Sequence, residues 1–147
     1  MLKVLIAEDD LMIADMTEEM LVERGYEVCG IARTVTEAVA LGRLHKPDLA
    51  VIDLRLADGE LGTEIAAQMG RQSKLGVLYA TGNISHAMLT TADGHACLAK
   101  PYRAADLQRS LEIVAEIVAT GTASPPFPRG FQVLPSATIG FREPSHG

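Results

Sequence analysis

Residues 1–120 alternate between short apolar runs and longer segments in which apolar residues recur at helical spacing. Short apolar runs are typical of buried strands, and helical spacing is typical of amphipathic helices that cover them. The runs predict five strands, at residues 2–7, 27–32, 48–53, 75–80 and 95–99. The intervening segments predict five helices, at residues 11–24, 36–45, 62–69, 85–91 and 104–118.

Strands that alternate with helices predict an α/β fold with a parallel sheet covered on both faces. We expect a doubly wound, five-stranded parallel sheet of the flavodoxin-like kind, with strand order 2-1-3-4-5 and five helices. Asp10 is the expected N-cap of the first helix and Thr36 that of the second. In open sheets of this kind, ligands bind beyond the carboxyl ends of the strands.

The composition changes after residue 120. Residues 121–147 contain five of the seven prolines and all three phenylalanines. A segment this short and rich in Pro and Gly cannot close a core of its own. We therefore expect one domain over residues 1–120, a tail over residues 121–147 and no output domain. The apolar residues of the tail suit docking on the body or on a partner, and disorder is the alternative.

Charge and composition exclude several classes of protein. The chain has 13 basic and 19 acidic side chains, a net charge of −6, and no basic run, so we expect no nucleic-acid partner. No apolar stretch approaches the roughly 20 residues of a membrane span or the roughly 7–15 of a signal peptide, which predicts a cytoplasmic protein away from membranes. Cys29 and Cys97 lack the spacing of a zinc site and are expected to be reduced.

Polar side chains lie at the carboxyl ends of four predicted strands. They are Glu8, Asp9, Asp10, Asp53, Thr81 and Lys100. Carboxylates that lie close together repel one another unless a proton, a cation or an ammonium group offsets their charge. Carboxylate oxygens also suit Mg²⁺, so the sequence predicts a magnesium site in which Lys100 neutralises one charge. Asp53 is placed to accept a phosphoryl group.

In order and spacing this set resembles the receiver domains of two-component response regulators, the CheY-like family, over residues 1 to about 119. The resemblance implies that Asp53 is the phosphoacceptor and that Thr81 and Lys100 hold the phosphoryl oxygens. It also implies Mg²⁺ as cofactor, with Asp9 as a direct ligand, Glu8 as a ligand through water and Asp53 and the backbone carbonyl of Arg55 as further ligands. From the residues alone, any two neighbours among Glu8, Asp9 and Asp10 could form the metal pair, and the strand phase favours the first two.

Further positions agree with or depart from this family. Lys100-Pro101 resembles its Lys-Pro step, where the peptide bond is typically cis, and Gly82 lets backbone N–H groups approach a phosphate. Asn83, like Arg55, corresponds to a position that flanks the path of the hydrolytic water. Cys97 occupies the place of the aromatic residue that serves as a rotamer switch, so we expect another element, the segment 82–93, to signal activation. The run Tyr79-Ala-Thr-Gly resembles the Phe-Ala-Thr-Gly motif of an atypical alphaproteobacterial receiver subfamily that lacks this aromatic residue.

We therefore expect a non-enzymatic, single-domain response regulator that takes a phosphoryl group from a sensor histidine kinase or a phosphotransfer protein. It would signal through protein contacts, to a downstream regulator or as a homodimer, or act as a phosphate sink. The alternative is a pseudo-receiver that binds partners without being phosphorylated. A phosphohydrolase is disfavoured because Asp53-Leu-Arg lacks a second Asp two residues on, and flavin binding because the acidic pocket would repel FMN.

Overall fold

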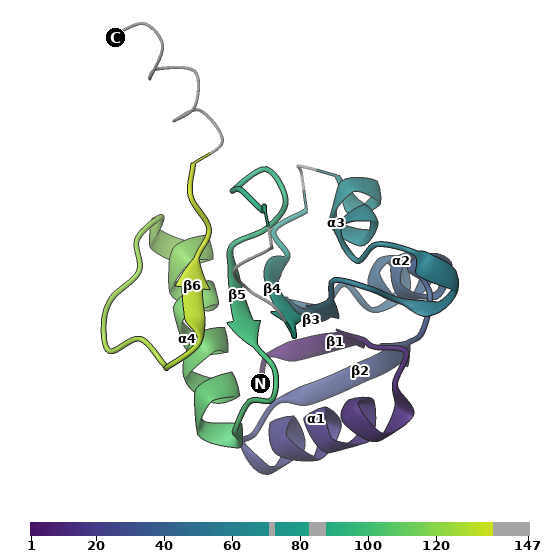
Figure 1. The fold of residues 1–147 in the computed structure, drawn as a ribbon, viewed down its shortest axis with the longest axis horizontal. Coiled ribbons are helices and arrows are strands. Elements are labelled where there is room, and N and C mark those ends of the chain that lie inside the picture. The colour runs from purple at the N-terminus through teal and green to yellow at the C-terminus, as the bar shows by residue number, and fades with distance from the viewer. Residues whose placement is uncertain (71–72, 83–87, 137–147) are drawn as a thin grey trace, which may run out of the picture.

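A six-stranded sheet with helices on both faces forms the body of the protein, in a computed structural model that describes residues 1–70, 73–82 and 88–136. The strand order is β2-β1-β3-β4-β5-β6, in which β1 to β5 are parallel and β6 is antiparallel to β5 (Figure 1). The strands are β1 (Lys3–Ala7), β2 (Glu27–Ala32), β3 (Leu49–Asp53), β4 (Gly76–Thr81), β5 (Ala96–Ala99) and β6 (Phe131–Val133). The helices are α1 (Leu11–Glu23), α2 (Val35–His45), α3 (Thr63–Met69) and α4 (Ala104–Thr120), with a 3₁₀ turn at Ala57–Gly59.

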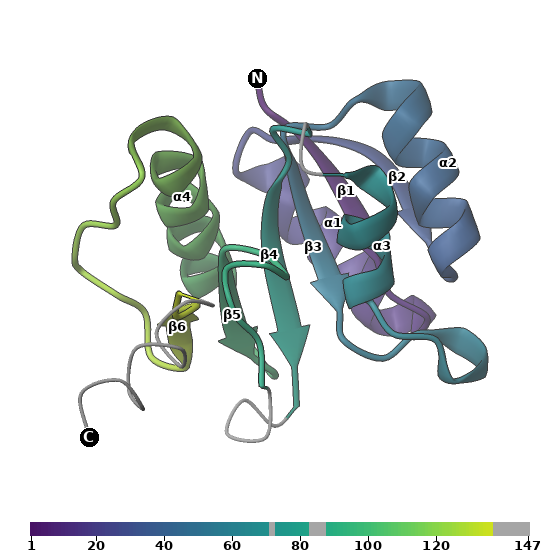
Figure 2. The ribbon, with the colours of Figure 1, turned by 90° about the horizontal axis from the view of Figure 1, so that it is seen from above.

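The core lies in two layers, one on each face of the sheet. Because side chains alternate along a strand, Val4 and Ile6 of β1 pack beneath α1 and α4, whereas Leu5 and Ala7 face α2 and α3. Figure 1 shows α1 on one side of the strands and α2 and α3 on the other, and Figure 2 shows the strands between α4 and the pair of α2 and α3. The flavodoxin-like arrangement and the order of the first five strands are therefore confirmed.

Two helix starts test the expected caps. The Asp10 carboxylate accepts hydrogen bonds from the N–H groups of Met12 and Ile13 at 3.0 and 3.3 Å, which confirms it as the N-cap of α1. The expected cap at Thr36 is wrong. Thr34 has the extended backbone of a cap, and its hydroxyl accepts from the Glu37 N–H at 3.1 Å. Thr34 is therefore the N-cap, and α2 begins at the next residue, Val35.

The described part of the helix expected at residues 85–91 is not helical. Residues 83–87 lie outside the described residues, and residues 88–91 are not helical. Here the Thr90 N–H donates to Asp93 Oδ2 at 2.9 Å and the Ala92 N–H to Thr90 Oγ1 at 3.2 Å. Such side-chain hydrogen bonds compete with those of a helix. The described residues accordingly form four α-helices, where five were expected.

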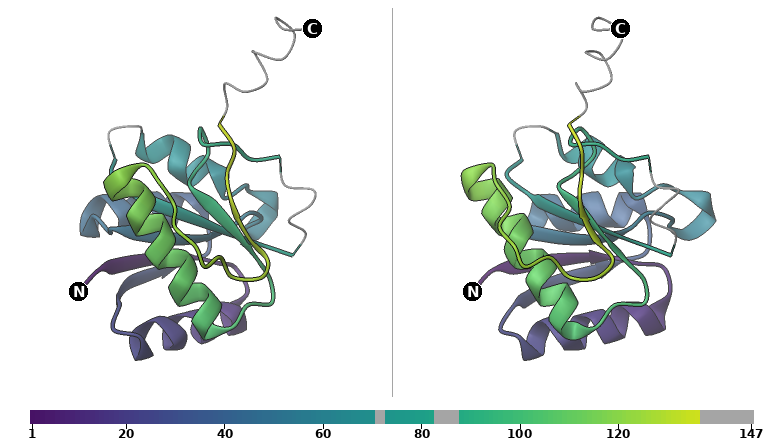
Figure 3. Two further views of the ribbon diagram at one scale, coloured as in Figure 1. Left: turned by 90° about the vertical axis from the view of Figure 1, so that its left-hand side faces the viewer. Right: turned by 60° about the vertical axis from the view of Figure 1, so that its left-hand side comes forward.

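The sheet has one strand more than the expected five, because residues beyond 120 contribute β6. Phe131 packs on the face of α1 and α4, and Leu134, which is buried, packs on the opposite face. Figure 3 shows the chain leaving α4, running back beside that helix and then joining the sheet edge. Among the described residues, no helix has both the length and the apolar character needed to cross a bilayer.

His95, just before β5, should make the stability of the fold depend on pH. Its Nδ1 accepts the Val77 N–H at 3.0 Å, and burial lowers the pKa of its imidazole. The unfolded chain therefore takes up a proton near pH 6.5 that the folded chain resists, so this contribution favours folding above that pH and is lost as the pH falls below it. His95→Asn keeps an acceptor without a titrating ring. Urea unfolding between pH 7.5 and 5.5 should show a smaller loss of stability in this variant than in the native protein. An equal loss in both would contradict the assignment.

Candidate functional site

The polar residues predicted at the carboxyl ends of four strands lie together at that end of the sheet. Glu8 and Asp9 follow β1, Asp53 ends β3, Thr81 ends β4 and Lys100 directly follows β5. These parallel strands are consecutive neighbours in the order β1-β3-β4-β5, so their carboxyl ends lie side by side. Topology therefore gathers residues that are up to 92 positions apart in the chain.

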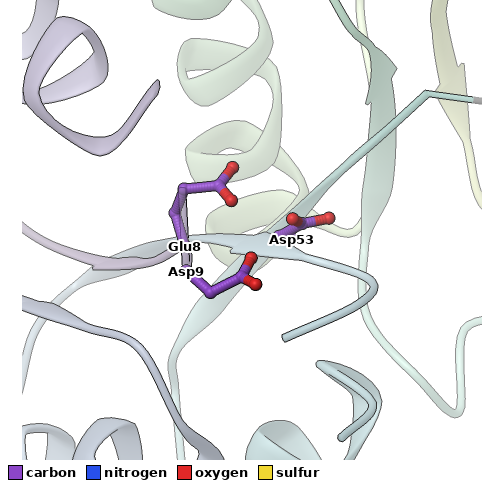
Figure 4. Close-up of side chains that lie close together, drawn as sticks. All are labelled: Glu8, Asp9 and Asp53. Carbon is purple, nitrogen blue, oxygen red and sulfur yellow. The ribbon is translucent and has the colours of Figure 1, made fainter. Parts of the chain in front are cut away.

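Three carboxylates form the acidic part of the site. Glu8, Asp9 and Asp53 each offer an oxygen, and these atoms lie within 4.8 Å of one another (Figure 4). Glu8 is only 5% exposed, whereas the other two are partly exposed. A donor set made only of carboxylate oxygens fits a hard cation such as Mg²⁺ or Ca²⁺ rather than a thiolate-preferring metal. Asp10 takes no part in this group, because its side chain caps α1.

Lys100 supplies the positive charge of the site. Its Nζ donates to Glu8 Oε1 at 2.7 Å and to Asp53 Oδ2 at 3.1 Å. The side chain is 18% exposed, so these ion pairs are shielded from solvent more than ordinary surface pairs. One ammonium group thus bridges the carboxylates that follow β1 and end β3.

The pKa values of two groups show how the charges balance. Burial raises the pKa of Glu8 to about 7, helped by neighbouring Asp53, although the hydrogen bond from Lys100 opposes the shift. Burial alone would lower the pKa of Lys100, but Glu8 and Asp53 outweigh it and the pKa is raised. Lys100 therefore keeps its positive charge, and the buried Glu8 carboxyl resists losing its proton.

The other residues that the sequence analysis assigned to the site lie around this group of charged side chains or in the core. Arg55 is exposed, and its N–H donates to Asp53 Oδ1 at 3.3 Å. Gly82 is exposed directly after Thr81, and Asn83 lies outside the described residues. Cys97 is buried in the middle of β5, in the same core layer as Tyr79, and the Lys100-Pro101 peptide bond is cis, as the resemblance implies.

Sequence reasoning missed two contacts beside the site. A Cβ atom at Gly62 would lie 2.1 Å from the backbone oxygen of Asp53, so only glycine lets the loop before α3 cross the end of β3. The Tyr102 hydroxyl lies 2.6 Å from Thr17 Oγ1, which ties the segment after Lys100 to α1. The glycines of Asp-Gly-Glu-Leu-Gly signal a tight loop in the sequence, but nothing signals the pairing of Thr17 with Tyr102.

Comparison with known proteins identifies the class that this fold and site define. Residues 4–112 match the model of the response regulator receiver domain, and the chain belongs to that family. It is 33% identical over 114 residues to the transcriptional regulatory protein PdtaR of Mycobacterium tuberculosis, a match that covers 76% of this chain and 55% of PdtaR. It is 35% identical over 80 residues to the phyllosphere-induced regulator PhyR of Methylorubrum extorquens, covering 54% of this chain and 30% of PhyR.

A solved structure agrees with this membership. The CheY-like receiver domain protein of Methanospirillum hungatei superposes with a TM-score of 0.70 at 28% identity, over 83% of this chain and 99% of that one. The chain spans about half the length, or less, of the curated relatives it matches. The likeness therefore concerns a receiver domain, and the activities of those longer proteins are not transferred with it.

Removing the Lys100 ammonium should destabilise the fold, because Glu8 would be left buried without its positive partner. We expect Lys100→Met to lower the free energy of unfolding at pH 8 by about 1–3 kcal/mol, as measured by urea denaturation without divalent cations. Adding Glu8→Gln to that variant should restore part of the loss, since the buried charge is then gone. Lys74→Met, at an exposed position, is the matched control and should change stability little. Equal effects of the two lysine substitutions would contradict the ion-pair role.

Proposed function

We propose that the protein is a phosphoacceptor signalling domain, phosphorylated on Asp53 by a phosphohistidine donor in the presence of Mg²⁺. The observation that carries the proposal is the position of the Asp53 carboxylate, which has an oxygen within 4.8 Å of oxygens of Glu8 and Asp9 and contacts Lys100. Membership of the receiver family supports the same role. A candidate nucleophile, candidate cation ligands and an ammonium group, the parts that phosphoryl acceptance requires, thus lie together at the carboxyl ends of the parallel strands.

In the proposed reaction, an Asp53 carboxylate oxygen attacks the phosphorus of the donor phosphohistidine. The P–N bond breaks, the imidazole leaves with the electron pair and takes up a proton, and Asp53 becomes an acyl phosphate. Lys100 Nζ, already 3.1 Å from Asp53 Oδ2, would hold one phosphoryl oxygen, and the Thr81 hydroxyl another. Arg55 and Asn83 would flank the water that later hydrolyses the acyl phosphate.

Glu8, Asp9 and Asp53 would hold Mg²⁺, with the backbone carbonyl of Arg55 as a further ligand. When bound, the ion offsets the negative charge shared by the carboxylates and the phosphoryl oxygens. The residues of this chain fit that task because their carboxylate oxygens already lie within 4.8 Å of one another. Because the pKa of Glu8 is raised to about 7, binding of the ion at or below neutral pH is expected to release protons from it.

A protein donor would find an apolar surface next to the site. Helix α1 begins two residues after Asp9, and its Met12 and Met16 side chains are 76% and 54% exposed. Residues four apart lie on one face of a helix, so these two methionines present a common patch. We propose that a sensor histidine kinase or a phosphotransfer protein docks there, and that output passes to a downstream regulator through protein contacts.

The central test is phosphorylation of the purified chain. After incubation with acetyl phosphate and Mg²⁺, we expect intact-mass analysis to show one added phosphoryl group, absent from Asp53→Asn and absent when a chelator removes the cation. A phosphohistidine-bearing kinase is the second donor, used if the small donor does not react. Failure with both donors would contradict the proposal and favour a receiver-like module that is not phosphorylated.

Mg²⁺ should bind the native protein without a donor and raise its melting temperature. Asp9→Asn should weaken Mg²⁺ affinity about tenfold or more, because it removes a charged ligand, as measured by isothermal titration calorimetry. Asp10→Asn is the matched control, since it removes a neighbouring charge while Asn remains a good N-cap. If both substitutions weaken binding equally, general electrostatics and not the proposed ligand set would account for the affinity.

A further inference from the structure

Residues 122–135, which we call the strap, cover one side of the molecule. The strap leaves the end of α4 after Gly121, runs back along that helix and joins the sheet as β6 (Figures 2 and 3). In β6, Phe131, Gln132 and Val133 pair with Leu98, Cys97 and Ala96. The strap therefore occupies the edge of β5, which would otherwise end the sheet with unpaired backbone groups.

Few interactions hold the strap to α4. Arg109 donates to the backbone oxygens of Ser124 and Pro126 at 2.7 and 3.0 Å, and the Glu116 carboxylate accepts from the N–H and the hydroxyl of Ser124 at 2.9 and 2.6 Å. These contacts lie at the surface, where water screens hydrogen bonds and charges and each contact stabilises little. Three residues pair in the sheet, and the side chains of Phe131 and Leu134 pack on its two core layers, so opening the strap requires these contacts to separate while the core beneath α1 to α4 stays folded.

The strap is nevertheless linked directly to the site. The Ala99 N–H donates to the Gly130 oxygen at 2.9 Å, and the next residue, Lys100, donates its N–H to the Thr81 oxygen at 2.8 Å. The fit at this point is close, because Gly130 has a φ of +79° and a Cβ there would lie 3.1 Å from the Ala99 Cβ. A movement of Lys100 therefore acts on the strap through a single residue.

Phosphorylation would supply the force for such a movement. Lys100 Nζ is shared between Glu8 and Asp53 in the unphosphorylated chain. A phosphoryl group on Asp53 adds negative charge beyond Oδ2, so the ammonium is drawn toward it. The Lys100 N–H is hydrogen-bonded to the Thr81 oxygen, and Lys100 directly follows β5. A displacement of the Lys100 backbone therefore also moves the end of β5.

We propose that the strap is the element that reports phosphorylation, an inference that rests on the proposed function. Charge on Asp53 draws the end of β5 away from Gly130, weakens the β5–β6 pairing and frees the edge of β5. The partner that fits this edge is a protein segment in extended conformation that adds as a strand. The strap is its intramolecular competitor, and it takes the signalling role that Cys97 cannot perform as an aromatic switch. This proposal replaces the expectation that segment 82–93 signals activation, a segment of which residues 83–87 lie outside the described residues.

Hydrogen exchange of the full chain tests this proposal. Intact mass first establishes that Asp53 carries the phosphoryl group, and exchange is then followed by mass spectrometry with and without donor. Amides that donate between the strap and the β5 segment, such as those of Leu134 and Ala99, should exchange about tenfold faster in the phosphorylated protein, and donor should have no effect on Asp53→Asn. If Asp53 stays unmodified with every donor, the proposed function fails and the strap proposal with it. If it is modified and β6 exchange is unchanged, the strap proposal alone is overturned.

Two variants should release the strap without phosphate. Gly130→Val places a Cβ against Ala99 and should give fast β6 exchange in the absence of donor. Gly25→Ala is its matched control, since Gly25 also has a positive φ, +89°, but has open space around it and lies far from the strap in the chain. Arg109→Ala removes two hydrogen bonds to the strap and should give an intermediate rate. Native rates in both strap variants would overturn the proposal.

Discussion

The ammonium group of Lys100 is the interaction on which the site depends. Three carboxylates from two strands converge within 4.8 Å, and at such distances like charges repel by several kcal/mol in a partly dry environment, about 4 kcal/mol at an intermediate dielectric. Lys100 contacts two of them and shifts the balance toward a folded, partly ionised site. The pKa of Glu8 is raised chiefly by burial, with a smaller contribution from Asp53, and the hydrogen bond from Lys100 only partly opposes that shift. The three converging carboxylate groups, of which Lys100 contacts two, are what make the site suited to a further cation.

The sequence predicts the parallel part of the fold well, because buried strands are continuous apolar runs bounded by polar residues. β2 is predicted with its observed bounds, and β1 and β3 to within a residue. β6 was missed because three residues near several prolines carry little signal, and their pairing is decided by the exposed edge of β5. The helix expected at 85–91 failed over its described residues because Thr90 and Asp93 form local hydrogen bonds that a periodicity argument does not see.

The same reasoning explains what could be predicted of the site. Residues at the ends of parallel strands converge whatever the details of packing, so Glu8, Asp53 and Lys100 could be placed together from the order of elements alone. Contacts between side chains or loops of different elements could not be predicted in this way. The closeness of Gly62 to the Asp53 backbone and the hydrogen bond between Thr17 and Tyr102 depend on how a loop and a helix settle against the sheet. The role of Asn83 stays a prediction, since it lies outside the described residues.

The strand that ends the sheet also bears on solubility. An open, flat strand edge is a template on which a second chain can add, and successive additions lead to aggregates. β6 covers the edge of β5 with only three residues, and prolines at 128 and 135, which lack an N–H donor, flank it on either side. A further chain would find too short a run of backbone groups to extend the sheet. Growth of the sheet therefore stops at this side of the molecule.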